Sequence, residues 1–195
     1  VWVVDSQGKV TNVPIARTPN WKVSDPEDVM SEWWKLEQPQ WWEQAKHQVK
    51  VGNRLMHRGT DAKHLTKSAD YYVGAKIWSE WGIVMGTPFP SLVEAFDGKR
   101  KAVAYQGIWF GSSGRSITNN RYFLEDKPHY LDSAGEHWFE KKGEGGRLFI
   151  RLPGDADPNR ARVEVAKRYS IIEDVCSAKA PNRLDVLGAR AHDPK

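Results

Sequence analysis

The apolar positions of this chain come in short runs bounded by polar turns. Residues 1–4 and 10–16 are rich in valine and flank a polar turn at 5–8, which predicts two paired strands. Further short strands are predicted where aromatic and β-branched residues are punctuated by glycine and proline, at 71–81, 82–85 and 102–110. This pattern indicates a mainly β protein.

The strongest local signal is a hairpin. Residues 136–141 and 147–152 flank a glycine-rich turn at 143–146. In the second arm, Leu148 and Ile150 alternate with Phe149, as a half-buried strand requires.

Helical signals are concentrated at 24–51. Ser24 or Asp25 can cap a helix there, and Pro26 suits its first position. A second helix is predicted to begin at Pro39. We therefore expect one or two short helices.

The C-terminal part carries very short apolar strands separated by polar turns, at 163–165, 170–172 and 184–186. Strands this short do not hold a sheet alone, but they can stack as the rungs of a solenoid.

Composition narrows the classes of partner. The chain has 195 residues, ten of them Trp, with 28% charged residues and a net charge of +4. The basic residues form no block of the kind that binds nucleic acid, and no apolar run reaches the ~18 residues of a membrane span. Cys176 is the only cysteine, so no internal disulfide is expected, and the residues that open the sequence at Val1 lack the pattern expected of a signal peptide. We expect a processed or excised piece of a larger extracellular protein, with neither a nucleic-acid partner nor a membrane span.

Several stretches resemble a known family. Residues 16–21 read Ala-Arg-Thr-Pro-Asn-Trp, residues 130–139 contain Leu-Asp-Ser-Ala-Gly-Glu-His-Trp, and residues 146–153 end an aromatic hairpin on proline. Together with Asn182-Arg183-Leu184-Asp185-Val186, they resemble secreted right-handed parallel β-helix proteins of the pectate-lyase-like superfamily. His137 separates Glu136 from Trp138, unlike the common Gly-Glu-Trp order of that family.

The resemblance implies a mainly β chain that forms the start of a right-handed parallel β-helix, with an inserted aromatic-rich β/loop region. It implies one domain or fragment over 1–195, with an insertion at 22–70 and the hairpin and first rungs at 120–195. It also implies an extracellular or cell-surface location, including the bacterial periplasm, and a polysaccharide partner. No catalytic residue is carried over, because the catalytic rungs of such proteins usually lie further along the solenoid.

Two tryptophan pairs are the candidate binding residues. Trp33, Trp34, Trp41 and Trp42 lie in a polar segment with glutamate, glutamine and lysine neighbours. Adjacent aromatics cannot both face one core, so one of each pair is expected to be partly exposed. An exposed indole with polar neighbours suits a sugar ring, while packing is the alternative. A second aromatic group is expected in the core: Trp78, Glu80, Trp81, Met85, Trp109 and Phe110.

The alternative that the chain is an enzyme depends on pairs or sets of side chains, most of which are far apart in the sequence. Glu80 with Asp132 or Glu136 is a carboxylate pair for glycoside hydrolysis. A lyase would need a base and a cation, and two sets are conceivable: His129 and Tyr130 with Arg121, or His137 with Arg147.

Metal and nucleotide signals are weak. His47, His57 and His64 lack metal-binding spacing and are interpreted as surface residues. No cofactor is expected, although a loop with Asp155, Asp157 and Asn159 can offer oxygens to calcium. The glycine-rich stretch 111–116 lacks the ending of a phosphate-binding loop.

The leading hypothesis is a carbohydrate-associated module that binds polysaccharide through exposed tryptophans. The alternatives are a polysaccharide lyase or glycoside hydrolase segment, and a structural module that packs on the rest of a larger chain or self-associates.

Overall fold

The computed structural model describes residues 1–5, 7–37, 48–80, 88–106 and 120–165. Within them the fold is mainly β with one short α-helix, α1 (Ala69–Tyr72), and three 3-10 helices, η2 (Pro128–Tyr130), η3 (Pro153–Asp155) and η4 (Pro158–Arg160). All pairings between the named strands are antiparallel. The mainly β prediction is confirmed. The parallel β-helix is not seen in these residues.

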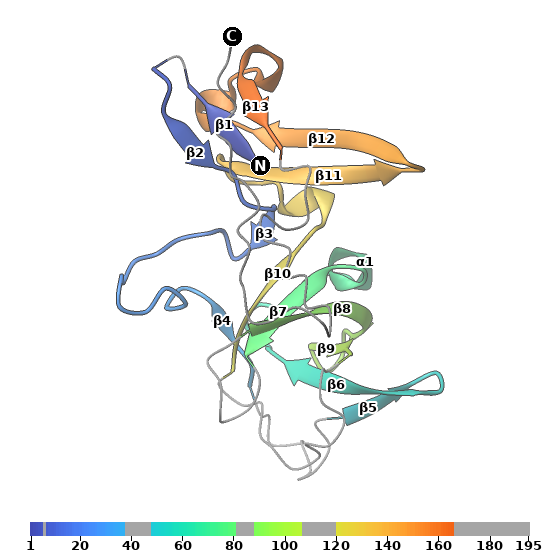
Figure 1. Cartoon of the computed structure of the whole chain (residues 1–195). Coiled ribbons are helices and arrows are strands. Elements are labelled where there is room, and N and C mark those ends of the chain that lie inside the picture. Colours follow the sequence, from blue (N-terminus) through green and yellow to red (C-terminus); the bar gives the residue numbers. More distant parts are fainter. Residues whose placement is uncertain (6, 38–47, 81–87, 107–119, 166–195) are drawn as a thin grey trace, which may run out of the picture.

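An eight-stranded sheet forms the larger part of the fold (Figure 1). Its main path runs through β3 (Arg17–Thr18), β10 (Arg121–Glu125), β7 (Lys76–Glu80), β8 (Pro88–Asp97), β9 (Ala102–Tyr105), β6 (Arg54–Thr60) and β5 (Gln48–Val51). The eighth strand, β4 (Trp34–Lys35), pairs with β10. Because β7 occupies one side of β10, β3 and β4 both lie along its other side.

A three-stranded sheet contains β1 (Trp2–Val4), β2 (Val10–Asn12) and β13 (Arg162–Glu164). The predicted turn between β1 and β2 is present, and the Asp5 carboxylate accepts hydrogen bonds from two of its backbone N–H groups. β13 pairs antiparallel with β1, so the rung expected at 163–165 is an antiparallel strand. The rungs expected at 170–172 and 184–186 lie outside the described residues.

The predicted hairpin is confirmed as β11 (Glu136–Lys142) and β12 (Gly145–Arg151). Leu148 and Ile150 are half-buried, whereas Phe149 between them is exposed. The hairpin is tied to the N-terminal segment, because His137 N–H donates to the carbonyl of Pro14. Figure 1 shows this hairpin and the three-stranded sheet together at one end of the molecule.

The helix prediction at 24–51 is wrong for the described residues. Residues 24–33 form turns, β4 follows, and 48–51 is β5. The Asp25 carboxylate accepts from Glu27 N–H and the Asp28 carboxylate from Met30 N–H. Such local bonds stabilise turns in competition with a helix. The helix starting at Pro39 lies largely outside the described residues.

The core lies on one face of the large sheet. Side chains along β10 alternate, so Tyr122 and Leu124 enter the core while Phe123 and Glu125 face the opposite side. The fully or nearly fully buried cluster contains Ala16, Leu36, Leu65, Tyr72, Ala75, Ile77, Val93, Val103, Tyr105, Tyr122, Leu124 and Tyr130. Residues 71 and 72, expected in a strand, are instead helical in α1, and Tyr72 packs into this core.

Segment 22–70 contributes β4, β5 and β6 to the large sheet. The division of the chain into domains stays a prediction. In the described ranges, no helix combines the length and apolar character needed to cross a membrane.

Candidate functional site: a pocket beside Trp34

Two of the four predicted tryptophans fall in the described residues. Trp33 is 9% exposed, while Trp34 is half-buried. Trp41 and Trp42 lie outside the described residues. The two visible indoles therefore differ in what they offer a ligand.

Trp33 serves mainly in packing. Its ring meets Phe123 edge-on, with ring centroids 4.5 Å apart. The guanidinium carbon of Arg17 lies 5.3 Å from the Trp33 ring and 3.6 Å from the Phe123 ring. Burial lowers the Arg17 pKa to about 10, although Glu125 and Glu136 oppose the shift.

Trp34 lies on the wall of a cavity of about 400 Å³. The cavity is lined by β4, its neighbours and the loop after β6: Trp33, Trp34, Lys35, Leu36, Glu37, Asp61, Lys63 and His64. We call it the Trp34 pocket. It combines a half-buried aromatic ring, which also packs against the core cluster, with carboxylate, ammonium and imidazole groups.

His64 stacks on Trp34. The two rings are nearly parallel, at 5°, with centroids 4.6 Å apart. Tyr122 contacts the Trp34 ring at a steep angle, with centroids 5.8 Å apart. These contacts hold the indole in one orientation.

The buried Asp61 carboxylate fixes the positions of several groups that line or support the pocket. It is 1% exposed, and its Oδ1 accepts from the backbone N–H groups of Lys63 and His64 at 3.1 and 3.0 Å. Its Oδ2 is 2.7 Å from His64 Nδ1 and accepts from the Tyr122 hydroxyl at 2.8 Å. Burial, followed by the Asp61 charge, raises the pKa of Tyr122 well above its usual value, so this hydroxyl stays a donor to Asp61.

The rim of the pocket is polar. Lys35, Glu37 and Lys63 are exposed. The Glu37 Oε2 accepts from Ala62 N–H at 2.9 Å, and Glu37 N–H donates to the Thr60 carbonyl at 2.7 Å. The Glu37 carboxylate is thereby fixed at the mouth.

A larger hollow of about 730 Å³ runs along β12. It presents Leu148, Ile150 and Leu152 together with Arg151 and Asp155. The last two form an ion pair with each other, and the hollow has no tryptophan among its lining residues. The Trp34 pocket is therefore the better candidate for sugar binding.

Only two members of the second aromatic group, Trp78 and Glu80, fall in the described residues. Trp78 is half-buried and stacks on Phe123 at 6.0 Å, and its indole N–H donates to Glu125 at 2.7 Å. Burial raises the pKa of Glu125. Glu80 is buried. Trp81, Met85, Trp109 and Phe110 lie outside the described residues.

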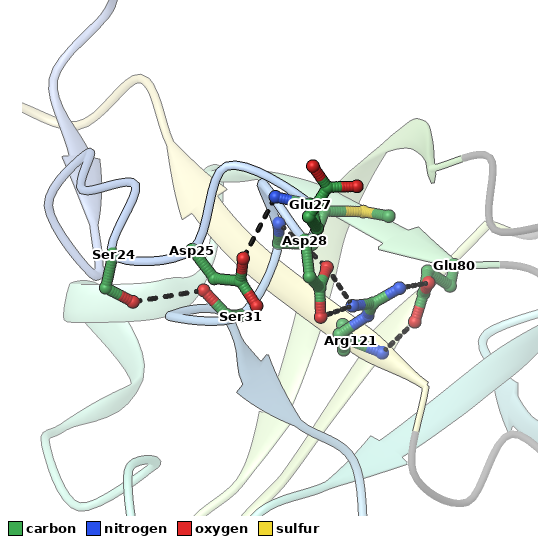
Figure 2. Close-up of polar contacts among 8 residues, drawn as sticks. Ser24, Asp25, Glu27, Asp28, Ser31, Glu80 and Arg121 are labelled. Atoms are coloured by element: carbon green, nitrogen blue, oxygen red, sulfur yellow. Dashed lines mark hydrogen bonds and ion pairs between the residues drawn. The ribbon is translucent and has the colours of Figure 1, made fainter.

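Arg121, considered above as a lyase cation, is committed to two carboxylates. It binds both oxygens of Asp28 at 2.6 and 2.7 Å, and Glu80 Oε1 at 2.7 Å. Figure 2 shows Asp28 and Glu80 converging on it, from the 24–31 loop and from β7. The arginine fastens this loop to the sheet.

The other lyase residues have structural contacts. The Tyr130 hydroxyl donates to the Tyr71 carbonyl at 2.8 Å, and His129 stacks on Tyr71. His137 Nδ1 bonds to the Val13 carbonyl at 2.8 Å. Arg147 lies opposite Glu140 in the hairpin.

Two of the three histidines expected on the surface are described. His57 is 5% exposed, so the surface interpretation is wrong for it. His64 lines the Trp34 pocket. His47 and the glycine-rich stretch 111–116 lie outside the described residues.

The calcium loop is held by its own contacts. Asp155 pairs with Arg151 and Asp157 with Arg160, and Asp157 also accepts from Asn159 N–H. Over the described ranges, no group of three or more His, Cys, Asp or Glu side chains is placed to hold a metal.

The Asp61–His64 pair was missed from the sequence. Its signal was the spacing of three residues between an aspartate and a histidine, which places them in reach within one turn. Its significance depends on Trp34 and Tyr122, which come from distant strands.

Comparison with known proteins adds no relative. The chain matches no family model, no curated protein and no solved structure. Its function is therefore argued from the geometry of the pocket.

Proposed function

We propose that this chain is a carbohydrate-binding module and that it binds sugar in the Trp34 pocket. The observation that carries the proposal is the half-buried Trp34 ring in a cavity whose rim holds Lys35, Glu37 and Lys63. Sugar rings combine an apolar face with peripheral hydroxyls. An aromatic wall with a polar rim matches both features.

The resemblance of residues 130–153 extends the proposal. It favours a module of a secreted or cell-surface parallel β-helix protein that acts on polysaccharide. The rungs in that proposal would follow the hairpin β11–β12. The described strands do not include them.

The experiment is a tryptophan fluorescence titration with a panel of polysaccharides and oligosaccharides. Trp34→Ala should weaken binding by about tenfold or more, because a desolvated aromatic contact contributes on the order of 1 kcal/mol beyond its buried area. Trp21→Ala is the matched control, since Trp21 is 53% exposed and does not line the pocket. Equal loss in both variants, or no binding by the wild type, would count against the proposal.

A lyase or hydrolase segment is the second candidate function. It is favoured by the buried Asp61 beside His64, an arrangement that orients a histidine for proton transfer. Such an enzyme would release new reducing ends or unsaturated uronates from a polysaccharide. Sugar binding without either product supports the module alone.

A further inference from the structure

The Trp34 pocket has features that narrow its ligand, and this inference rests on the proposed function. His64 covers one face of the Trp34 ring at 4.6 Å. At most one face of the indole remains for a ligand. A sugar can therefore stack on Trp34 only at the face that His64 leaves open.

The tautomer of His64 follows from its partner. Nδ1 lies 2.7 Å from Asp61 Oδ2, and this oxygen already accepts the Tyr122 hydroxyl. An ionised carboxylate only accepts hydrogen bonds, so Nδ1 carries the proton. In the neutral imidazole Nε2 is then an acceptor, and among the described residues the ring's hydrogen bond is made by Nδ1, which leaves Nε2 for a ligand.

His64 is accessible enough to use that nitrogen. Its side chain is 26% exposed, while Asp61 beneath it is 1% exposed. The imidazole is held between Trp34 and Asp61, so little rotational freedom is lost when a ligand binds. Such a fixed acceptor selects for a donor at one position.

The size of the cavity limits the length of the ligand. Pockets that enclose a drug-sized molecule measure about 300–1,000 Å³, and the Trp34 pocket, at about 400 Å³, is near the lower end. It has room for about one or two sugar rings.

We propose that the pocket recognises a terminal sugar residue or a short oligosaccharide, with one sugar hydroxyl donating a hydrogen bond to His64 Nε2. Trp34 supplies the apolar contact to the ring. Asp61 and Tyr122 are positioning residues, because they act on the ligand through His64.

The first test is a length series of oligosaccharides of the best-binding glycan, measured by calorimetry on the whole chain. Affinity should stop rising at about two sugar units. Affinity that keeps rising with each added unit would overturn the chain-end assignment. Absence of binding by every glycan would instead overturn the proposed function.

The second test identifies the hydrogen bond. His64→Phe keeps a ring beside Trp34 but removes both nitrogens, and it should weaken binding by about threefold to tenfold. Monodeoxy sugars should show one hydroxyl whose removal costs the wild type a similar factor and costs His64→Phe nothing. His129→Phe is the control, because His129 also stacks on an aromatic ring but does not line the pocket.

Each outcome has a defined meaning. If His64→Phe does not fold, His64→Gln and the wild-type deoxy-sugar series decide the question. If all monodeoxy sugars bind the wild type equally well, or if His64→Phe keeps the same hydroxyl preference, the assignment to His64 is wrong while sugar binding itself stands.

Discussion

Glu136 is 3% exposed at the start of β11, and its chemistry couples folding to pH. Burial is the largest cause that raises its pKa from 4.5 to about 7, and Asp132 adds to the rise while Arg17 opposes it. The folded chain therefore holds this proton more tightly than the unfolded chain does. The stability linked to Glu136 is fully present below about pH 4.5, and it is lost as the pH rises through about 7.

The Glu136→Gln variant should remove this pH dependence. A pKa moved from 4.5 to about 7 corresponds to a loss of up to about 3 kcal/mol between pH 4.5 and pH 8. Urea unfolding at pH 5 and pH 8 measures the free energy of unfolding of both proteins. The value for the variant should rise relative to that of the wild type between pH 5 and pH 8. A difference between the two proteins that is the same at both pH values would contradict this account.

Tyr122 offers a second test at the level of one residue. Tyr122→Phe keeps the buried ring but removes the hydroxyl that donates to Asp61. The Asp61 carboxylate, 1% exposed, then loses a hydrogen bond that water cannot easily replace. We expect a loss of about 1–3 kcal/mol in the free energy of unfolding, measured by chemical denaturation. A change of only a few tenths would show that Asp61 is satisfied without Tyr122.

Among the elements, the hairpin β11–β12 shows most directly how sequence determines structure. Two of its glycines, Gly145 and Gly146 at the start of β12, differ in their surroundings. A Cβ on Gly146 would collide with the Glu140 carbonyl and the Phe139 ring, whereas a Cβ on Gly145 meets nothing within 4 Å. The second glycine is therefore required by close packing, and the first is not.

The pair Gly146→Ala and Gly145→Ala tests that difference. Gly146→Ala must displace backbone or the Phe139 ring, so we expect a loss of about 1–3 kcal/mol. Gly145→Ala should stay within about 0.5 kcal/mol of the wild type. Thermal melts of the two variants side by side provide the measurement, and equal melting temperatures would exclude steric contact at Gly146.

The elements also show what the sequence could predict. The hairpin and the β1–β2 turn were predictable because their signals, glycines and Asp5, act within a few residues. The turns at 24–33 were mistaken for a helix, because a capping aspartate and a turn-forming aspartate look alike. What decides between them is tertiary: Asp28 binds Arg121, 93 residues away. No local pattern contains that contact.

The candidate site, too, was predictable only where its signals are local in the sequence. Trp34 was identified by its polar surroundings. Alternation explains why the two indoles part: Trp34 pairs with Tyr122 and packs half-buried against the core cluster, whereas Trp33 lies against Phe123 on the opposite face of the sheet. The pocket itself could not be predicted, because it needs β4 to pair with β10 and Tyr122 to reach Asp61, 61 residues away. Neighbours in the sequence suggested the proposed ligand class, whereas long-range pairing created the shape of the pocket.

Over the whole molecule, the first and the last described strands belong to one small sheet. β1 lies between β2 and β13, and the three residues of β13 pair with the three of β1. The side chains of β2 are exposed along its length. We therefore expect the pairing with β13 to contribute much of the stability of β1 in the sheet. A two-stranded hairpin is marginally stable alone.

Truncation should therefore separate the small sheet from the large one. A chain ending after Ala161 loses β13, whereas a chain ending after Val165 keeps it and serves as the matched control. In the shorter chain we expect the amides of residues 2–4 to exchange with solvent about tenfold faster or more, while β7 and β10 keep their protection, because their bonds lie in the large sheet. Hydrogen exchange read by mass spectrometry resolves both regions. Loss of protection throughout the shorter chain would show that the two sheets fold as one cooperative unit, and unchanged protection at 2–4 would show that β2 alone is enough to hold β1.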